Sequence, residues 1–260
     1  QALHFASRRC VGKGSGLMKI NISPSTHRVP DEQREKYVAE PGFGKYFTDH
    51  MVVAEWNQSS GWSDATVKEY GPLELDPAAM VFHYGQEIFE GMKAYSQPDG
   101  SIALFRPEAN GLRFAKSAAR ITLPELPVND FVEAVKALVV QDKGWVPKKI
   151  GESLYIRPFM IATEVGLGVR PSNKALFAVI ATPAAAYFNA AKAVTVWIST
   201  EYVRAALGGT GEAKCGGNYA ASLLAQQQAA QQGCDQVVWL DAKERRWVEG
   251  VFAGKKRLGL

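Results

Sequence analysis

One lysine in this chain stands in a setting that suits nucleophilic chemistry. Lys214 lies between the glycine-rich stretches 208–211 (GGTG) and 216–217 (GG). Glycine has no Cβ, so the backbone beside this lysine can approach a flat ligand closely. Partial burial there would disfavour the ammonium form, and a neutral lysine amine can form a Schiff base with an aldehyde. The same residues can also be interpreted as a mobile surface loop with a solvated lysine.

Two predicted elements follow the lysine and would position it and a carboxylate. The run NYAASLLAQQQAAQQG predicts a helix with Asn218 as its N-cap and Gly233 at its end, so Lys214 would precede a helix start. The segments QVVWLD (236–241) and RRWVEG (245–250) predict a β-hairpin around a charged turn. Glu249 lies at the end of the second strand, where a surface glutamate is the simplest interpretation.

The longer pattern around the lysine identifies a family. GTGEAKCGGNYAASLLAQ, followed by QVVWLDAKERRWVEG, closely resembles the branched-chain aminotransferases, which are fold-type IV pyridoxal phosphate enzymes. The resemblance covers about residues 30–250. It implies a mixed α+β fold of two domains, with pyridoxal 5'-phosphate held on Lys214 as an internal aldimine. Lys214 would also move the substrate's α-proton.

The resemblance also implies a reaction and partners. L-leucine, L-isoleucine or L-valine would donate the amino group and 2-oxoglutarate would accept it, in an enzyme that forms homodimers. Two relatives of the same fold type keep a similar lysine and glutamate, the D-amino-acid aminotransferases and the aminodeoxychorismate lyases. A non-catalytic product is a third alternative.

Residue roles follow from the resemblance as well. On the cofactor side, Arg113 would bind the phosphate, Tyr219 the phenolate and Glu249 the pyridine nitrogen. On the substrate side, Tyr84, Phe89 and Gly91 would wall a pocket for a branched aliphatic group. Tyr155 would contact the substrate carboxylate, and Arg157 would orient the groups around that carboxylate. Without the resemblance, core aromatics, solvated cations and a structural ion pair are the ordinary interpretations.

The elements that carry these residues can be predicted from their patterns. PEANGLRFAKSAARI predicts a helix that starts at Pro107, with Arg113 flanking its apolar stripe. Arg106, Lys116 and Arg120 are competing cations, although the register relative to FRP favours Arg113. SLYIRPFMIA predicts a strand whose alternation places Tyr155 and Arg157 on one side.

Composition excludes several function classes. The chain is 47% apolar and 22% charged, and its formal charge of +4 is not gathered in a stripe, which argues against nucleic acid. The longest apolar stretch, from Ala175, is too short for a membrane span and contains Pro183. Three cysteines without a CxxC pair and four scattered histidines predict neither a disulfide framework nor a metal site. We therefore expect a cytoplasmic protein, with the mitochondrion as the alternative.

The expected domain organisation has four parts. They are a disordered leader (1–29), a small α+β domain (30–184), a linker (185–193) and the start of a larger cofactor-binding domain (194–260). The resemblance ends after Glu249, so we expect the second domain to be incomplete in this chain.

Overall fold

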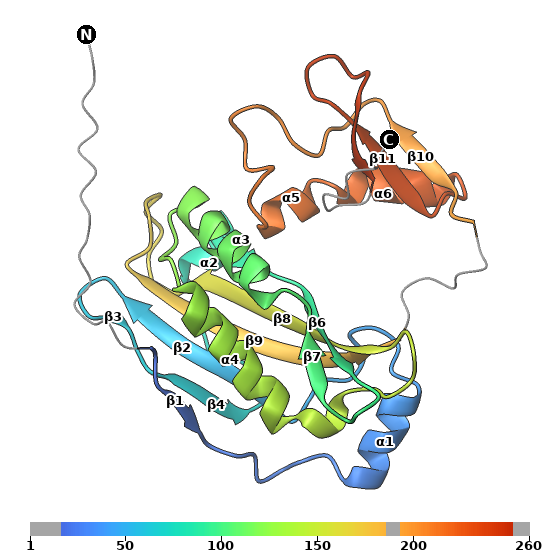
Figure 1. The fold of residues 1–260 in the computed structure, drawn as a ribbon. Coiled ribbons are helices and arrows are strands. Elements are labelled where there is room, and N and C mark those ends of the chain that lie inside the picture. Colours follow the sequence, from blue (N-terminus) through green and yellow to red (C-terminus); the bar gives the residue numbers. More distant parts are fainter. Residues whose placement is uncertain (1–16, 186–192, 252–260) are drawn as a thin grey trace.

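A large mixed sheet with helices on one face forms most of the protein, and a smaller sheet-and-helix unit follows it along the chain (Figure 1). The computed structural model describes residues 17–185 and 193–251. Most of the predicted linker, 186–192, therefore lies outside the described residues, as do 1–16 and 252–260. The mixed α and β content agrees with the predicted fold class.

The large sheet has nine strands. In the order β1-β4-β2-β9-β8-β6-β7 the neighbours are hydrogen-bonded, while β3 pairs with β2 and β5 with β8. All described pairings in it are antiparallel except that of β1 with β4. Its strands are β1 (Ile20–Ile22), β2 (His50–Asn57), β3 (Gly61–Trp62), β4 (Ala65–Glu69), β5 (Glu87–Phe89), β6 (Met92–Ser96), β7 (Ile102–Leu104), β8 (Ser153–Ala162) and β9 (Lys174–Ala184).

Two long helices, α3 (Pro107–Arg120) and α4 (Val128–Gln141), cover one face of this sheet (Figure 1). The predicted helix from Pro107 is confirmed, with proline at its first position, where the missing N–H costs nothing. Phe114, Phe131 and Phe177 meet between helices and sheet, with ring centroids 5.2 to 6.2 Å apart. Full burial of each ring contributes roughly 1.5–3 kcal/mol, so this cluster fixes α3 against the sheet.

The central strand β8 has one buried and one half-buried face. Leu154, Ile156 and Met160 are fully buried, whereas Tyr155 and Arg157 are half-buried. Side chains alternate along a strand, so the apolar set faces the helices and the other set lies on the opposite face. The predicted side-by-side placement of Tyr155 and Arg157 is therefore confirmed.

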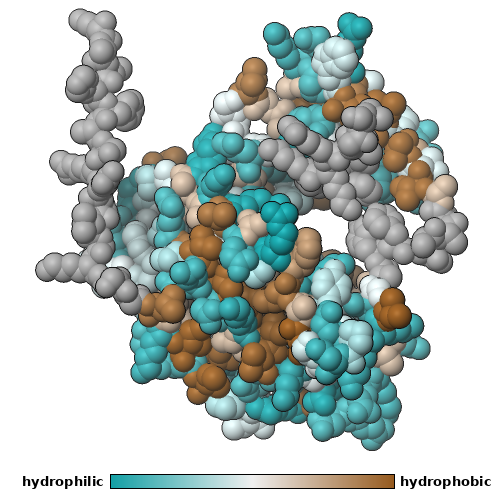
Figure 2. Space-filling view, viewed as in Figure 1, coloured by the Kyte–Doolittle hydropathy of each residue, from teal (hydrophilic) through white to brown (hydrophobic). Residues whose placement is uncertain are grey.

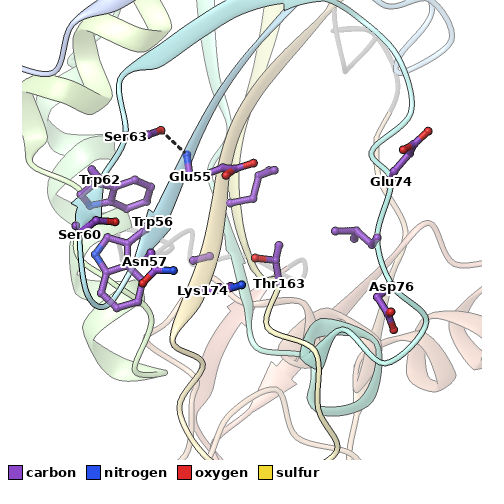
Figure 3. A pocket seen from close by; sticks show the side chains of 14 residues that line it. Glu55, Trp56, Asn57, Ser60, Trp62, Ser63, Glu74, Asp76, Thr163 and Lys174 are labelled. Atoms are coloured by element: carbon purple, nitrogen blue, oxygen red, sulfur yellow. Dashed lines mark hydrogen bonds between the residues drawn. The ribbon is translucent and has the colours of Figure 1, made fainter.

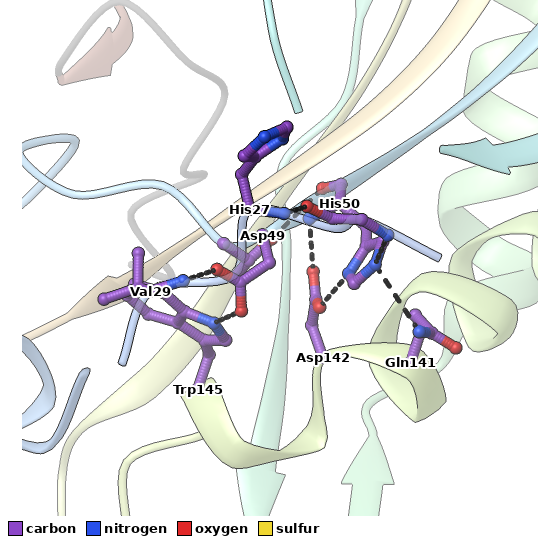
Figure 4. A network of polar contacts seen from close by, with 9 residues as sticks. His27, Val29, Asp49, His50, Gln141, Asp142 and Trp145 are labelled. Atoms are coloured by element: carbon purple, nitrogen blue, oxygen red, sulfur yellow. Dashed lines mark hydrogen bonds and ion pairs between the residues drawn. The ribbon is translucent and has the colours of Figure 1, made fainter. Parts of the chain in front are cut away.

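A buried polar network ties the N-terminal segment to this sheet (Figure 4). The Ser25 N–H donates to His50 Nε2 at 2.9 Å, so Nδ1 carries the ring proton and donates to Asp142 Oδ1 at 2.6 Å. Burial raises the pKa of Asp142, and the bonds from His50 oppose this. Strand β1 belongs to this N-terminal segment and pairs with β4. A strand therefore lies within residues 1–29, which were predicted to be a disordered leader.

Short helices complete the first part of the chain. They are α1 (Asp31–Ala39), α2 (Met80–Tyr84) and the 3-10 helix η1 (Lys143–Trp145). Figure 2 shows apolar side chains (brown) among hydrophilic ones (teal) on one face of the molecule. Leu112 of α3 and Val140 of α4 are exposed. None of the helices in the described part of the chain is long and apolar enough to cross a bilayer.

The smaller sheet lies in the second part of the chain and packs on α6. Its strands β10 (Val196–Ser199), β11 (Gln236–Leu240) and β12 (Val248–Val251) pair in that order, and β11 and β12 form the predicted antiparallel hairpin. Trp239 is fully buried with Ala225 and Ala229 of α6. This packing supports Glu249 at the hairpin's second strand.

The predicted continuous helix from Asn218 is wrong in two respects. It is divided into α5 (Gly216–Ala220) and α6 (Leu223–Gln231), and Asn218 lies inside α5 rather than at its cap. Its side-chain amide donates to the carbonyls of Thr210 and Ala213, so it ties the glycine-rich loop to α5 instead of capping a helix. Gly233 follows the end of α6 with a φ of +69°, as predicted for a stop.

Candidate functional site

The backbone around Lys214 is fastened to both α3 and β5. The Lys214 N–H donates to Ser117 Oγ at 2.9 Å, and its carbonyl accepts the Phe89 N–H at 3.0 Å. The Gly216 N–H donates to the carboxylate of Glu87. A Cβ on Gly216 would lie 3.0 Å from Glu87 Cδ and still closer to Oε1, so a side chain at this position would displace the Glu87 carboxylate. The lysine loop is thus anchored, in contrast to the mobile-loop alternative.

The amine of Lys214 lies among aromatic rings. Its Nζ donates to the Tyr219 hydroxyl at 2.5 Å and lies 4.4 Å from the centroid of the Phe89 ring. Burial lowers the pKa of Lys214; the charge of Glu90 opposes this, and that of Arg113 adds to it. The neutral amine is therefore available at a lower pH than in a free lysine.

Tyr219 supports this amine from α5. Its ring packs on Phe89 with centroids 4.9 Å apart. Burial raises the pKa of its hydroxyl, while the charges of Arg113 and Arg157 oppose the rise. The phenol accordingly stays protonated and keeps a hydrogen that it can donate.

Arg113 meets a buried carboxylate that sequence analysis missed. Its Nε donates to Glu90 Oε1 at 2.5 Å and its Nη2 to Oε2 at 2.7 Å, and Glu90 is fully buried. The hydrogen bonds to Glu90, and after them its negative charge, raise the pKa of Arg113. A glutamate within the apolar stretch IFEGM was the available signal, because a charge there needs a partner.

Tyr155, Arg157 and Gly91 lie next to one another beside Phe89. Arg157 Nη2 donates to the Tyr155 hydroxyl at 3.0 Å, and its guanidinium carbon lies 4.6 Å from the Phe89 ring centroid. Arg157 Nε is buried with no hydrogen-bond partner. The added Cβ of an alanine at Gly91 would lie 3.0 Å from Tyr155 Cζ, so the missing side chain makes room for the tyrosine.

Glu249 lies on β12 and pairs with a buried arginine that was not predicted. Arg204 Nη2 donates to Glu249 Oε1 at 2.8 Å, while Glu249 Oε2 is buried without a hydrogen-bond partner. Arg204 Nη1 also donates to the Gly211 carbonyl at 3.2 Å, so this pair contacts the glycine-rich loop that precedes Lys214. An orphaned carboxylate oxygen is able to accept a hydrogen bond from a ligand.

Tyr84 is the predicted residue that the described contacts do not connect to the others. Its hydroxyl donates to the carbonyl of Leu167, and its ring lies beside His83. The described contacts thus gather Lys214, Tyr219, Phe89, Gly91, Arg113, Tyr155 and Arg157 in one place, with Glu249 joined through Arg204.

A separate pocket of about 580 Å³ lies elsewhere on the sheet (Figure 3). Trp56 and Trp62 line it on one side, and Glu74 and Asp76 on the other. Its lining includes none of the predicted site residues. Among the described residues, no group of histidines, cysteines and carboxylates is arranged to hold a metal ion.

Comparisons with known proteins agree on one family. The family described as Amino-transferase class IV matches residues 87–254. A probable branched-chain-amino-acid aminotransferase of Streptomyces coelicolor is 61% identical over 232 residues, which are 88% of this chain and 64% of that protein. A branched-chain-amino-acid aminotransferase of Mycolicibacterium smegmatis is 59% identical over 237 residues, 90% of this chain and 64% of that protein.

The fold comparison agrees. The crystal structure of a T.th. branched-chain amino acid aminotransferase with pyridoxamine 5'-phosphate is 26% identical, with a TM-score of 0.61, over 77% of this chain and 62% of that one. The chain thus spans about 64% of the length of the curated relatives it matches.

Proposed function

The chain belongs to the class IV aminotransferases, and we propose that it transfers the amino group of L-leucine, L-isoleucine or L-valine to 2-oxoglutarate with pyridoxal 5'-phosphate as cofactor. The observation that carries the proposal is the half-buried Lys214 amine, held at 2.5 Å from the Tyr219 hydroxyl, with its pKa lowered by burial. The names of the relatives that are 61% and 59% identical support the choice of substrate.

The residues present fit this cofactor. Glu249 offers a buried oxygen, Oε2, that lacks a partner and suits a protonated pyridine nitrogen. Arg113 would hold the phosphate, Tyr219 would hydrogen-bond the phenolate oxygen, and Lys214 would bind the aldehyde carbon. When bound, pyridoxal phosphate supplies an electron sink for the negative charge that develops at the substrate's α-carbon.

The chain's own groups then have separate tasks. The neutral Lys214 Nζ accepts the α-proton of the substrate and later returns it, and its lowered pKa favours the neutral form that this step requires. Tyr155 and Arg157 offer a hydroxyl and a cation to the substrate carboxylate. Phe89 and Gly91, with Tyr84, wall the aliphatic side chain, for which an aromatic surface gives dispersion contacts.

Turnover of matched substrates tests the proposal. Purified protein supplied with pyridoxal phosphate is expected to transfer nitrogen from L-leucine to 2-oxoglutarate, faster than from D-alanine and with no lyase activity on aminodeoxychorismate. The Lys214→Ala variant should lose this activity by several orders of magnitude. Turnover of D-alanine or of aminodeoxychorismate in preference to L-leucine would overturn the assignment.

The assembly and the compartment are parts of the same proposal. We place the protein in the cytoplasm as a homodimer that acts on small amino acids and 2-oxo acids. Free Cys215 and Cys234 are consistent with a reducing compartment. Sedimentation of the purified protein at twice the monomer mass of 28.4 kDa would support the dimer, and sedimentation at the monomer mass would contradict it.

A further inference from the structure

Glu90 is a fully buried carboxylate to which the proposed reaction gives no task. It lies between Phe89 and Gly91, and its side chain is 0% exposed. Besides Arg113 it accepts hydrogen bonds from Asn110 Nδ2 at 2.8 Å and the Gly91 N–H at 3.1 Å, both at Oε2. A buried charge is costly unless it is paired and well bonded. Such complete bonding indicates that the position of this carboxylate is fixed.

The pairing leaves one edge of the Arg113 guanidinium open. A guanidinium carries N–H donors along two edges, and Glu90 takes the edge formed by Nε and Nη2. The edge formed by Nη1 and the second hydrogen of Nη2 points away from the carboxylate. The Arg113 side chain is 53% exposed although its partner is buried, so the open edge is accessible. Two parallel N–H groups of this kind match two oxygens of a phosphate.

A competing cation lacks this arrangement. Arg120, on the same helix, donates its Nη2 to the carbonyls of Gly208 and Gly209 at 2.9 and 3.1 Å. Its guanidinium therefore binds the glycine-rich loop. A free guanidinium on a long side chain would lose rotamer entropy on binding an anion, whereas Glu90 removes that cost for Arg113 in advance.

We propose that Glu90 is a positioning residue that holds Arg113 with its open edge toward the phosphate of the bound cofactor. The inference rests on the proposed function. It predicts that Glu90 affects binding of the phosphate group and not of the pyridine ring. Glu90→Gln keeps the shape of the side chain but removes its charge. It also leaves one oxygen where the guanidinium now meets two, because the other is replaced by an N–H₂ group that cannot accept.

Two titrations of the full chain test this inference. Dissociation constants of pyridoxal 5'-phosphate and of pyridoxal, which lacks the phosphate, are measured for the wild type and for Glu90→Gln. We expect binding of pyridoxal phosphate to weaken about tenfold relative to that of pyridoxal in the variant, as for the loss of one charge-assisted hydrogen bond, whereas any effect of the Glu90 charge on Lys214 acts on both ligands alike. In an Arg113→Ala background, Glu90→Gln should have no further effect on this difference. Equal weakening of both ligands, or no weakening, would overturn the proposal.

A matched control separates positioning from general structure. Glu87, on the same segment, binds the Gly216 N–H of the lysine loop, so Glu87→Gln should weaken both ligands together. Circular dichroism checks that each variant is folded. If Glu90→Gln is not, Glu90→Asp takes its place with the same expected selectivity, because its shorter side chain cannot reach both guanidinium nitrogens. A wild type that binds neither ligand would instead refute the proposed function.

Discussion

Replacing Gly91 with alanine tests the packing of the site. The added Cβ would lie 3.0 Å from Tyr155 Cζ, 3.3 Å from Cε2 and closer still to the hydroxyl oxygen, whereas ordinary contacts lie at 3.4–4 Å. The hydroxyl end of the tyrosine must therefore move by about 1 Å to reach an ordinary contact distance. It cannot do so freely, because Arg157 donates to its hydroxyl and Phe43 packs edge-on at 5.1 Å between centroids.

Both stability and substrate binding should respond to Gly91→Ala. Overpacking of this kind costs about 1–3 kcal/mol of unfolding free energy. The displaced hydroxyl should also raise the KM for L-leucine, because it is proposed to contact the carboxylate. Urea unfolding and steady-state kinetics measure the two effects. Gly71→Ala is the control, since its added Cβ meets nothing within 4 Å and its φ is not in the left-handed region.

The size of the effect discriminates between explanations. A Gly91→Ala protein that matches Gly71→Ala in unfolding free energy and in KM would refute the packing of Tyr155 against Gly91. A loss of stability with an unchanged KM would keep the packing but refute the contact of Tyr155 with the substrate carboxylate.

Three further predictions concern charged groups. Asp142→Asn should cost about 1–3 kcal/mol in urea unfolding, because an amide cannot accept from both the backbone and the ring of His50; an unchanged midpoint would contradict this. Arg170 lowers the pKa of Glu164 to about 2, so the pair's contribution is present above pH 4.5 and lost as the pH falls toward about 2. Glu164→Gln should remove that pH dependence. The lost unfolding free energy should be under about 1 kcal/mol because the Arg170 partner is exposed, and a wild-type pH profile in the variant would contradict this. Labelling of Lys214 by an aldehyde should rise with pH at lower values than labelling of exposed lysines, and coincident profiles would exclude a lowered pKa.

Features with local causes could be predicted from the sequence. The α3 helix follows from the spacing of its apolar residues and from Pro107. The buried and half-buried faces of β8 follow from the alternation of its side chains along the strand. The glycines around Lys214 predicted close approach to a flat ligand, which stays a prediction, and the close contact that the structure shows at Gly216 is with the Glu87 carboxylate. These patterns depend only on residues near one another along the chain.

Features that depend on distant partners could not be predicted in this way. Glu90 and Arg113 are 23 residues apart, Arg204 and Glu249 are 45, and Glu87 and Gly216 are 129. No periodicity reports which buried cation a carboxylate will meet. Asn218 was misread for the same reason, because its helix-cap pattern competes with bonds to loop carbonyls at Thr210 and Ala213 that only the fold brings within reach.

Mass spectrometry of the borohydride-reduced protein tests most directly whether Lys214 holds the cofactor. The full chain is incubated with pyridoxal 5'-phosphate, reduced, digested and compared with Lys214→Ala treated in the same way. We predict that the cofactor's mass is added to the peptide that carries Lys214 and to no corresponding peptide of the variant. Addition to other lysines alone, or equal labelling of both proteins, would contradict the assignment.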